Sequence, residues 1–162
     1  MRLLLIITFA VLSIGISNAQ DKNDSKEDKK ARIQRLIESR NFVFVARSAN
    51  PMGGNFINLT SLYDVRVSSD TLKSDLPYFG RAFVAPVNPT ESALRFTSTD
   101  FNYITKARKK GGWDITITPK DGKDVRQMNL TVSDNGYAML QVMSNNRQPI
   151  TFNGSIEEKN RR

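Results

Sequence analysis

The sequence of 162 residues contains neither cysteine nor histidine. Without histidine, the protein has no Ser-His-Asp triad, no Cys-His dyad and no imidazole ligand for a metal ion. Without cysteine, it has no thiolate nucleophile, no disulfide, no thiolate zinc site and no lipid-anchored cysteine. We therefore predict a protein that is not an enzyme, has no cofactor and no metal site, and is stabilised by its apolar core alone.

The N-terminal segment, residues 1–19, has the pattern of a secretory signal peptide. Arg2 precedes an apolar run from Leu3 to Ile16, and Ser17-Asn18-Ala19 places small residues at the positions that signal peptidase reads. A membrane-spanning helix needs about 20 apolar residues, and this run is shorter. We predict cleavage after Ala19, which leaves 143 residues with a formal net charge of +7 and no membrane span. The expected location is periplasmic or secreted.

The next segment changes from charged residues to a short helical pattern. Residues 20–30 are dense in charges of both signs, so we predict a flexible leader there. Ile33, Leu36 and Ile37 then recur at helical spacing, which predicts one short amphipathic helix ending near Ser39. The lysine and arginine excess in this region is expected to lie on a solvated face of that helix.

From Phe42 onward the apolar period is two residues, as strands require. The breaks between these runs contain residues that tolerate a positive φ, as hairpin turns need: Gly111-Gly112, Asp121-Gly122, Asp134-Asn135-Gly136 and Asn145-Asn146. We predict a single all-β domain, residues 31–158, with one N-terminal helix. About eight or nine antiparallel strands would form a meander that closes into a barrel, and a two-sheet sandwich is the alternative.

Several strings in the β-rich part resemble a known family. They are Leu76-Pro77-Tyr78-Phe79-Gly80-Arg81, preceded by Asp70-Thr71-Leu72, and then Gly111-Gly112-Trp113, Asn135-Gly136-Tyr137 and the run from Ser144 to Gly154. Together they are similar to the bacterial envelope family called domain of unknown function 4251, which is typical of the Bacteroidota. The resemblance implies an exported protein with a β-rich fold, and it implies no activity.

Four residues are candidates for a ligand site: Tyr78, Phe79, Arg81 and Arg147. The two aromatic rings would form an apolar or stacking wall, and the two guanidinium groups would hold an anionic group. The alternative is structural: Tyr78 and Phe79 fold inward and close one end of the barrel, and Arg147 lies on a solvated hairpin turn. Large aromatic side chains are mostly buried, which favours the structural alternative.

Other charged residues allow further hypotheses. Lys106, Arg108, Lys109 and Lys110 form a basic cluster that either steers anionic envelope partners or protects an edge strand from aggregation. A nucleic-acid partner is not expected, because no recognised binding motif is present. The carboxylates Glu91, Asp100 and Asp114 would suit a glycan hydrolase only if two of them faced each other across a cleft. Asp70-Thr71-Leu72 also resembles an O-glycosylation acceptor at Thr71, and a plain turn explains it equally well.

These observations favour a non-enzymatic β-barrel module that binds a small amphiphilic or envelope-derived ligand. Barrels of about eight strands are either filled by side chains or hold one small ligand. The alternatives are a protein–protein interaction module of the cell envelope and, as a less favoured hypothesis, a carboxylate-based glycan hydrolase.

Overall fold

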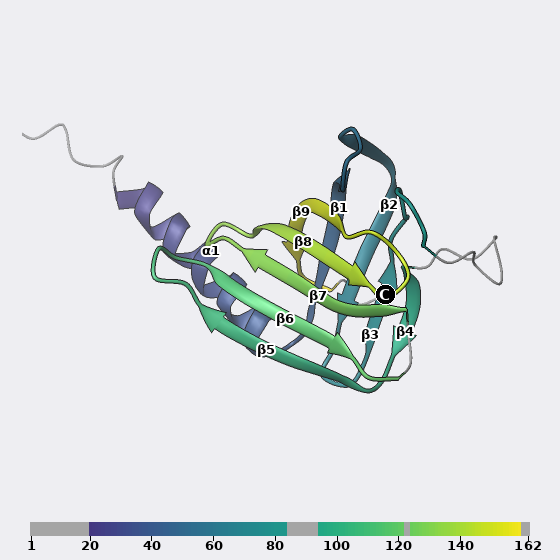
Figure 1. Ribbon diagram of the computed structural model, residues 1–162. Coiled ribbons are helices and arrows are strands. Elements are labelled where there is room, and N and C mark those ends of the chain that lie inside the picture. The colour runs from purple at the N-terminus through teal and green to yellow at the C-terminus, as the bar shows by residue number, and fades with distance from the viewer. Residues whose placement is uncertain (1–19, 84–93, 122–123, 160–162) are drawn as a thin grey trace, which may run out of the picture.

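The computed structural model describes residues 20–83, 94–121 and 124–159 (Figure 1). Within these residues, nine strands form one antiparallel sheet in the order β4-β3-β2-β1-β9-β8-β7-β6-β5. The strands are β1 (Phe42–Pro51), β2 (Ile57–Val67), β3 (Leu72–Asp75), β4 (Arg95–Ser98), β5 (Phe101–Ala107), β6 (Trp113–Pro119), β7 (Val125–Val132), β8 (Tyr137–Ser144) and β9 (Ile150–Glu157). The sequence predicted this all-β meander, and the structure confirms it.

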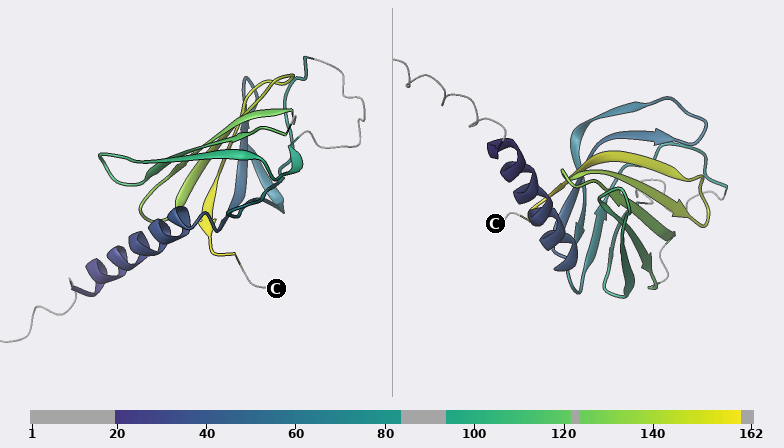
Figure 2. Two further views of the ribbon diagram at one scale, coloured as in Figure 1. Left: turned by 90° about the horizontal axis from the view of Figure 1, so that it is seen from below. Right: turned by 90° about the vertical axis from the view of Figure 1, so that its left-hand side faces the viewer.

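The sheet curls into a nearly closed barrel, as the two views in Figure 2 show. The strands at its two edges, β4 and β5, follow each other in the chain with only Thr99 and Asp100 between them. Next to this link the backbone N–H of Lys120 donates to the carbonyl of Asp100 at 2.8 Å, which extends the β5–β6 ladder beyond Phe101 and Pro119. The barrel prediction is therefore confirmed, and the sandwich alternative does not apply.

The barrel interior is filled by one continuous cluster of apolar side chains. Each strand from β6 to β9 sends alternate residues inward, and Trp113, Ile115 and Ile117 of β6 are all less than 9% exposed. The largest side chains with less than 2% exposure come from both halves of the sheet: Phe42, Phe44, Phe152, Ile37, Leu72, Leu76, Leu94, Ile115, Ile117, Met128, Leu140 and Ile150. The apolar core thus occupies the space in which a barrel of this size would otherwise hold a ligand.

The helix α1 (Gln20–Glu38) closes one end of the barrel with its last turns and projects beyond it with the rest (Figures 1 and 2). Ile33, Leu36 and Ile37 join the core, whereas the side chains from Ser25 to Arg32 are all exposed. The prediction of a flexible leader over residues 20–30 is corrected, because this stretch is helical. Its lysine, glutamate and glutamine residues are good helix formers, and they extend the turns that the core fixes.

Two segments that bear on the sequence-based expectations lie outside the described residues. One is residues 84–93, which follow an isolated bridge between Ala82 and Arg147. The other is the predicted signal peptide, residues 1–19. In the part of the chain that the structure describes, no helix is long and apolar enough to cross a membrane.

Candidate functional site

A cleft of about 530 Å³ lies between the projecting part of α1 and two turns of the sheet. One wall is α1, and the other sides are the β5–β6 turn and the β7–β8 turn, which both lie at the α1 end of the barrel. The lining residues are Lys26, Glu27, Lys29, Lys30, Arg108, Lys110, Gly111, Ser133, Asp134 and Asn135. We call this site the basic cleft, because five of these side chains are cationic and two are anionic.

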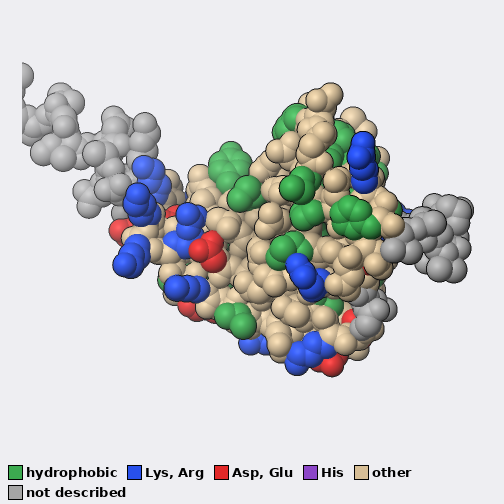
Figure 3. Space-filling model, in the orientation of Figure 1, with side chains coloured by type: hydrophobic (Ala, Val, Ile, Leu, Met, Phe, Trp, Pro, Cys, Tyr) green, Lys and Arg blue, Asp and Glu red, His purple; other side chains and the backbone are tan. Residues whose placement is uncertain are grey.

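The helical wall is basic because three lysines share one face of α1. Lys26, Lys29 and Lys30 are spaced at i, i+3 and i+4, so their side chains are neighbours on the helix surface. Blue side chains gather over α1 in Figure 3, in line with this spacing. The sequence-based interpretation placed the lysine excess on a solvated face, and the structure shows that this face lines the basic cleft.

The two turns are joined to each other by a partly buried hydrogen bond between a backbone N–H and a side chain. The N–H of Gly112 donates to the Asp134 carboxylate at 2.9 Å, so the β5–β6 turn is fixed against the β7–β8 turn. Gly112 has a φ of 83°, and a side chain there would collide with the carbonyl oxygen of Val132. The predicted hairpin residues therefore build the sides of the basic cleft and hold Arg108 and Lys110 in place.

The position of α1 against these turns is fixed by close packing. Gly136 has no side chain, and a Cβ at this position would lie 2.9 Å from the Cδ1 atom of Ile33. At the C-terminal end of α1, the Tyr103 hydroxyl of β5 donates to the carbonyl of Ile37 at 3.1 Å. Burial raises the pKa of Tyr103 above its usual range, although the guanidinium of Arg40, 5.1 Å from its ring centre, lowers it. Tyr103 is therefore a neutral donor at physiological pH.

The cations of the basic cleft are only partly neutralised by the protein. Lys30 lies 3.8 Å from the Asp134 carboxylate, and Arg108 lies 3.8 Å from that of Asp114. Among the side chains that the structure describes, from Ser25 onward, none forms an ion pair with Lys26, Lys29 or Lys110. A concave site with an excess of one charge raises the local concentration of oppositely charged ligands. The basic cleft is thus suited to anions.

The predicted ligand residues lie at the opposite end of the barrel, where they contact each other. The Arg147 guanidinium is 5.2 Å from the Tyr78 ring centre and forms an ion pair with Asp124 at 3.2 Å. The Tyr78 hydroxyl donates to the carbonyls of Arg81 and Gln148 at 2.8 and 3.2 Å. Burial raises the pKa of Tyr78, and the charge of Arg147 partly opposes this. We call Tyr78, Arg81, Asp124, Arg147 and Gln148 the Tyr78 cluster.

Phe79 and Arg81 are the other two residues of the predicted ligand site. Phe79 is half-buried and packs against the core, whereas the Arg81 side chain is exposed and only its backbone enters the Tyr78 cluster. The structure therefore brings Tyr78 and Arg147 together and leaves the Arg81 side chain exposed. The contacts of Tyr78 and Phe79 support the structural alternative for these two aromatics. Arg147 differs from that alternative, because its side chain is only 15% exposed and is not solvated. A ligand role for the four residues stays a prediction.

The carboxylates considered for glycan hydrolysis are separated by a whole strand. Asp100 precedes β5 and Asp114 pairs with Lys106 near its other end, so they are about 20 Å apart at about 3.3 Å per residue. Paired glycosidase carboxylates lie within about 10 Å of each other. Both side chains are exposed, and Glu91 lies outside the described residues. The geometry gives no support to the hydrolase alternative.

Taken together, the curled antiparallel sheet with a capping helix and a basic cleft at one end defines a helix-capped β-barrel domain. The model of a family described as a domain of unknown function, DUF4251, matches residues 24–156. The chain belongs to this family, as the resemblance in the sequence implied.

The fold is similar to a solved member of the same family. A crystal structure of a DUF4251 family protein from Bacteroides eggerthii matches with a TM-score of 0.60 and 18% sequence identity. The match covers 83% of this chain and 91% of that chain. No curated protein matches the sequence. This likeness shows the fold of the chain.

Proposed function

We propose that this protein is a non-enzymatic, exported β-barrel module that binds an anionic, envelope-derived ligand in the basic cleft. The observation that carries the proposal is the meeting of Lys26 and Lys29 of α1 with Lys110 of the β5–β6 turn around one cleft. Lys110 is far in sequence from the two lysines of α1. None of the three forms an ion pair with a described side chain.

The filled interior supports a site outside the barrel. Phe44, Phe152 and Met128 are all less than 2% exposed and belong to the continuous core. A ligand inside would have to displace such side chains, and each vacated contact would cost packing energy. The basic cleft is open to solvent and needs no such rearrangement. The amphiphilic ligand of the sequence-based hypothesis is therefore narrowed to one with an anionic group.

Export is supported by the signal-like pattern of residues 1–19, and a periplasmic or secreted location is part of the proposal. The absence of histidine and cysteine from the whole sequence supports a binding role over catalysis, since the usual nucleophile–base pairs need these residues. The anionic groups available in an envelope are phosphates and carboxylates. Both types accept charge-assisted hydrogen bonds from lysine and arginine.

The first test is a titration of the protein with inorganic phosphate, followed by amide NMR shifts. We expect the shifts to concentrate at residues 26–30 and 108–111 and to weaken when salt is raised above about 0.15 M. The double variant Lys29→Gln/Lys110→Gln should bind about tenfold more weakly, since each exposed charge contact contributes up to about 1 kcal/mol.

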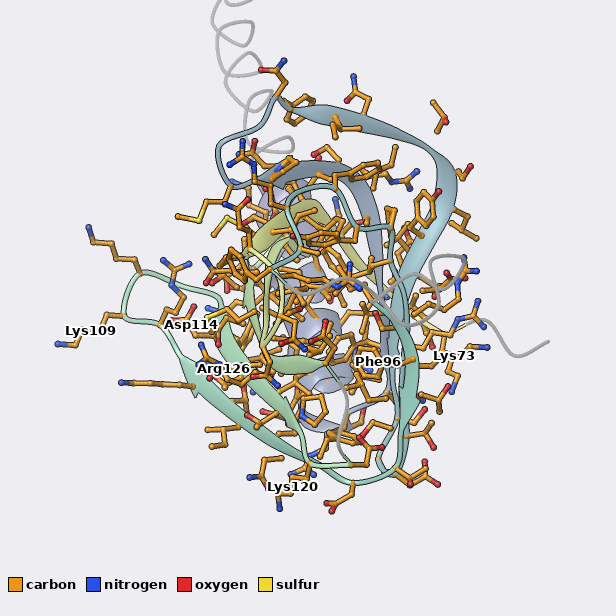
Figure 4. The ribbon with its side chains drawn as sticks, turned by 45° about the vertical axis from the view of Figure 1, so that its right-hand side comes forward. Lys73, Phe96, Lys109, Asp114, Lys120 and Arg126 are labelled. Atoms are coloured by element: carbon orange, nitrogen blue, oxygen red, sulfur yellow. The ribbon has the colours of Figure 1, made fainter. Side chains whose placement is uncertain are left out.

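The matched control is Lys73→Gln/Lys120→Gln, which removes two charges from exposed positions away from the cleft. In Figure 4, Lys73 lies on the opposite side of the barrel from Lys109, which marks the tip of the β5–β6 turn. The control should bind phosphate as tightly as the wild type. Shifts spread evenly over all surface lysines, or an equal loss in the control, would show that the cleft has no special role.

A second candidate function, docking of another envelope protein, is favoured by the β1–β2 hairpin. Met52 and Phe56 of the turn and Leu62 of β2 are 65%, 59% and 71% exposed, and exposed apolar side chains that form a patch mark interaction surfaces. A pull-down from periplasmic extract should then return a stoichiometric partner that the variant Met52→Ser/Phe56→Ser loses. If the wild type returns no stoichiometric partner, this candidate is excluded.

A further inference from the structure

The basic cleft has cations on two separate walls, and this arrangement bears on the ligand. Lys26 and Lys29 belong to α1, whereas Arg108 and Lys110 belong to the β5–β6 turn. Like charges cannot neutralise each other across the cleft. A single anion close to one wall would leave the opposite wall unpaired, while a ligand with two anionic groups would pair with both.

The size of the cleft agrees with this arrangement. Its volume of about 530 Å³ lies in the range of about 300–1,000 Å³ that is typical of sites for small organic ligands. One inorganic anion is much smaller than this. A ligand with several anionic groups on one molecule would occupy more of the volume and would reach both walls.

The helical wall also has little support from the apolar core. The side chains from Ser25 to Arg32 are exposed, and the contacts of α1 with the core begin at Ile33. A helix without an apolar face is marginal in water. Lys26 also lies three and four residues from Lys29 and Lys30, and like charges at this spacing destabilise a helix. Anionic groups bound to these lysines would remove that repulsion.

We propose that the ligand carries at least two anionic groups, binds one at each wall of the basic cleft, and thereby stabilises the projecting part of α1. This inference rests on the proposed function and adds the ligand class and its structural effect. The shared chemistry is a small molecule with clustered phosphate or carboxylate groups. Bridging of two walls makes the second contact intramolecular, so the affinity rises steeply with the number of anionic groups.

The experiment compares inorganic phosphate with tripolyphosphate by calorimetry at equal ionic strength. We expect tripolyphosphate to bind at least about tenfold more tightly to the wild type. Lys29→Gln changes only the helical wall, and Lys110→Gln changes only the turn wall. Either single variant should reduce the difference between the two anions to about threefold or less, because bridging needs both walls. Lys73→Gln, away from the cleft, should leave the difference unchanged.

Hydrogen exchange gives an independent readout of α1. Tripolyphosphate should slow the exchange of amides in residues 25–32, and phosphate should do so much less. If both anions bind equally well, or if the difference survives in both wall variants, the bridging inference is wrong while the anion-binding proposal stands. If tripolyphosphate binds without slowing exchange in residues 25–32, the stabilisation of α1 is wrong. If neither anion binds, the proposed function itself is wrong.

Discussion

The hydrogen bond from Tyr103 to α1 allows a sharp prediction, because it joins β5 to the C-terminal end of the helix. In Tyr103→Phe the ring and its contact with Arg40 remain, and only the hydroxyl that donates to the Ile37 carbonyl at 3.1 Å is lost. That carbonyl keeps a second donor, the Arg40 N–H at 3.2 Å. We therefore expect a loss of about 1 kcal/mol in the free energy of unfolding, the net value of one hydrogen bond.

The pH dependence of this loss follows from the raised pKa of Tyr103. In the unfolded chain the phenol titrates near pH 10, whereas burial keeps it protonated to a higher pH in the folded state. The stabilisation is therefore complete below about pH 10 and is lost as the pH rises toward the folded-state pKa. Above the unfolded-state pKa, the free energy of unfolding of the wild type falls by about 1.4 kcal/mol per pH unit. The stability difference between wild type and Tyr103→Phe should therefore disappear at about pH 11.

Unfolding by urea and unfolding by heat, both followed by Trp113 fluorescence, measure the loss of stability and its pH dependence. At about pH 8 the variant should unfold at lower urea, with a melting temperature about 3–5 °C below the wild type for a domain of this size. Tyr137→Phe is the control, because the Tyr137 side chain is 70% exposed and the change should have no effect. A stability difference that is absent at pH 8, or one that persists unchanged near about pH 11, would refute the reasoning.

Two further predictions concern the barrel itself. Tyr78→Phe removes the hydrogen bonds to the carbonyls of Arg81 and Gln148, so thermal unfolding should show a loss of about 1 kcal/mol while phosphate binding at the basic cleft stays unchanged. An unchanged melting temperature would show that the Tyr78 cluster does not stabilise the barrel end. Gly154→Ala places a methyl group against the Val45 carbonyl, so it should destabilise the domain by about 1–3 kcal/mol in the same assay. A wild-type melting temperature would contradict the close β1–β9 packing.

The strands that the sequence predicted well are those with one buried face. Ile115 and Ile117 alternate with exposed or half-buried neighbours, so the period-two pattern reads directly as a strand. The sequence pattern does not predict β3 (Leu72–Asp75), because one of its two inward residues, Ser74, is polar. The Ser74 hydroxyl is buried and donates to the Leu94 carbonyl at 2.6 Å, a long-range contact that no local pattern reveals.

The β1–β2 pairing could not be predicted from a local sequence pattern either. Ser48 pairs with Asn58 and Ala46 pairs with Tyr63, so a single β1 residue, Arg47, lies opposite several residues of β2. Such a bulge shifts which side chains face inward, and it leaves Leu62 exposed. The alternation of Tyr63, Val65 and Val67 predicts only the second half of β2, because the apolar residues of its first half do not keep a fixed period.

The candidate site was only half predictable. The basic cluster around Lys110 was visible as a charge run, but its partner Lys29 lies about 80 residues earlier in the chain. Only the antiparallel order of the sheet brings the β5–β6 turn, the β7–β8 turn and α1 to the same end of the barrel. The contacts within the Tyr78 cluster were unpredictable for the same reason, since Tyr78 and Arg147 approach each other only after the sheet has curled.

The strand order also divides the described sheet into two contiguous pieces of chain. β1 to β4 form one set of neighbouring strands and β5 to β9 form the other, and within the sheet they are hydrogen-bonded to each other only along β1 and β9. Residues paired along this seam are separated by about 100 residues of chain, so its formation carries a large loop-closure entropy and is expected to limit the folding rate. Because the other connection is the short link between β4 and β5, a backbone cut at Thr99-Asp100 would leave every strand ladder intact. The two resulting fragments would carry complementary edges and would reassemble by adding β9 to β1.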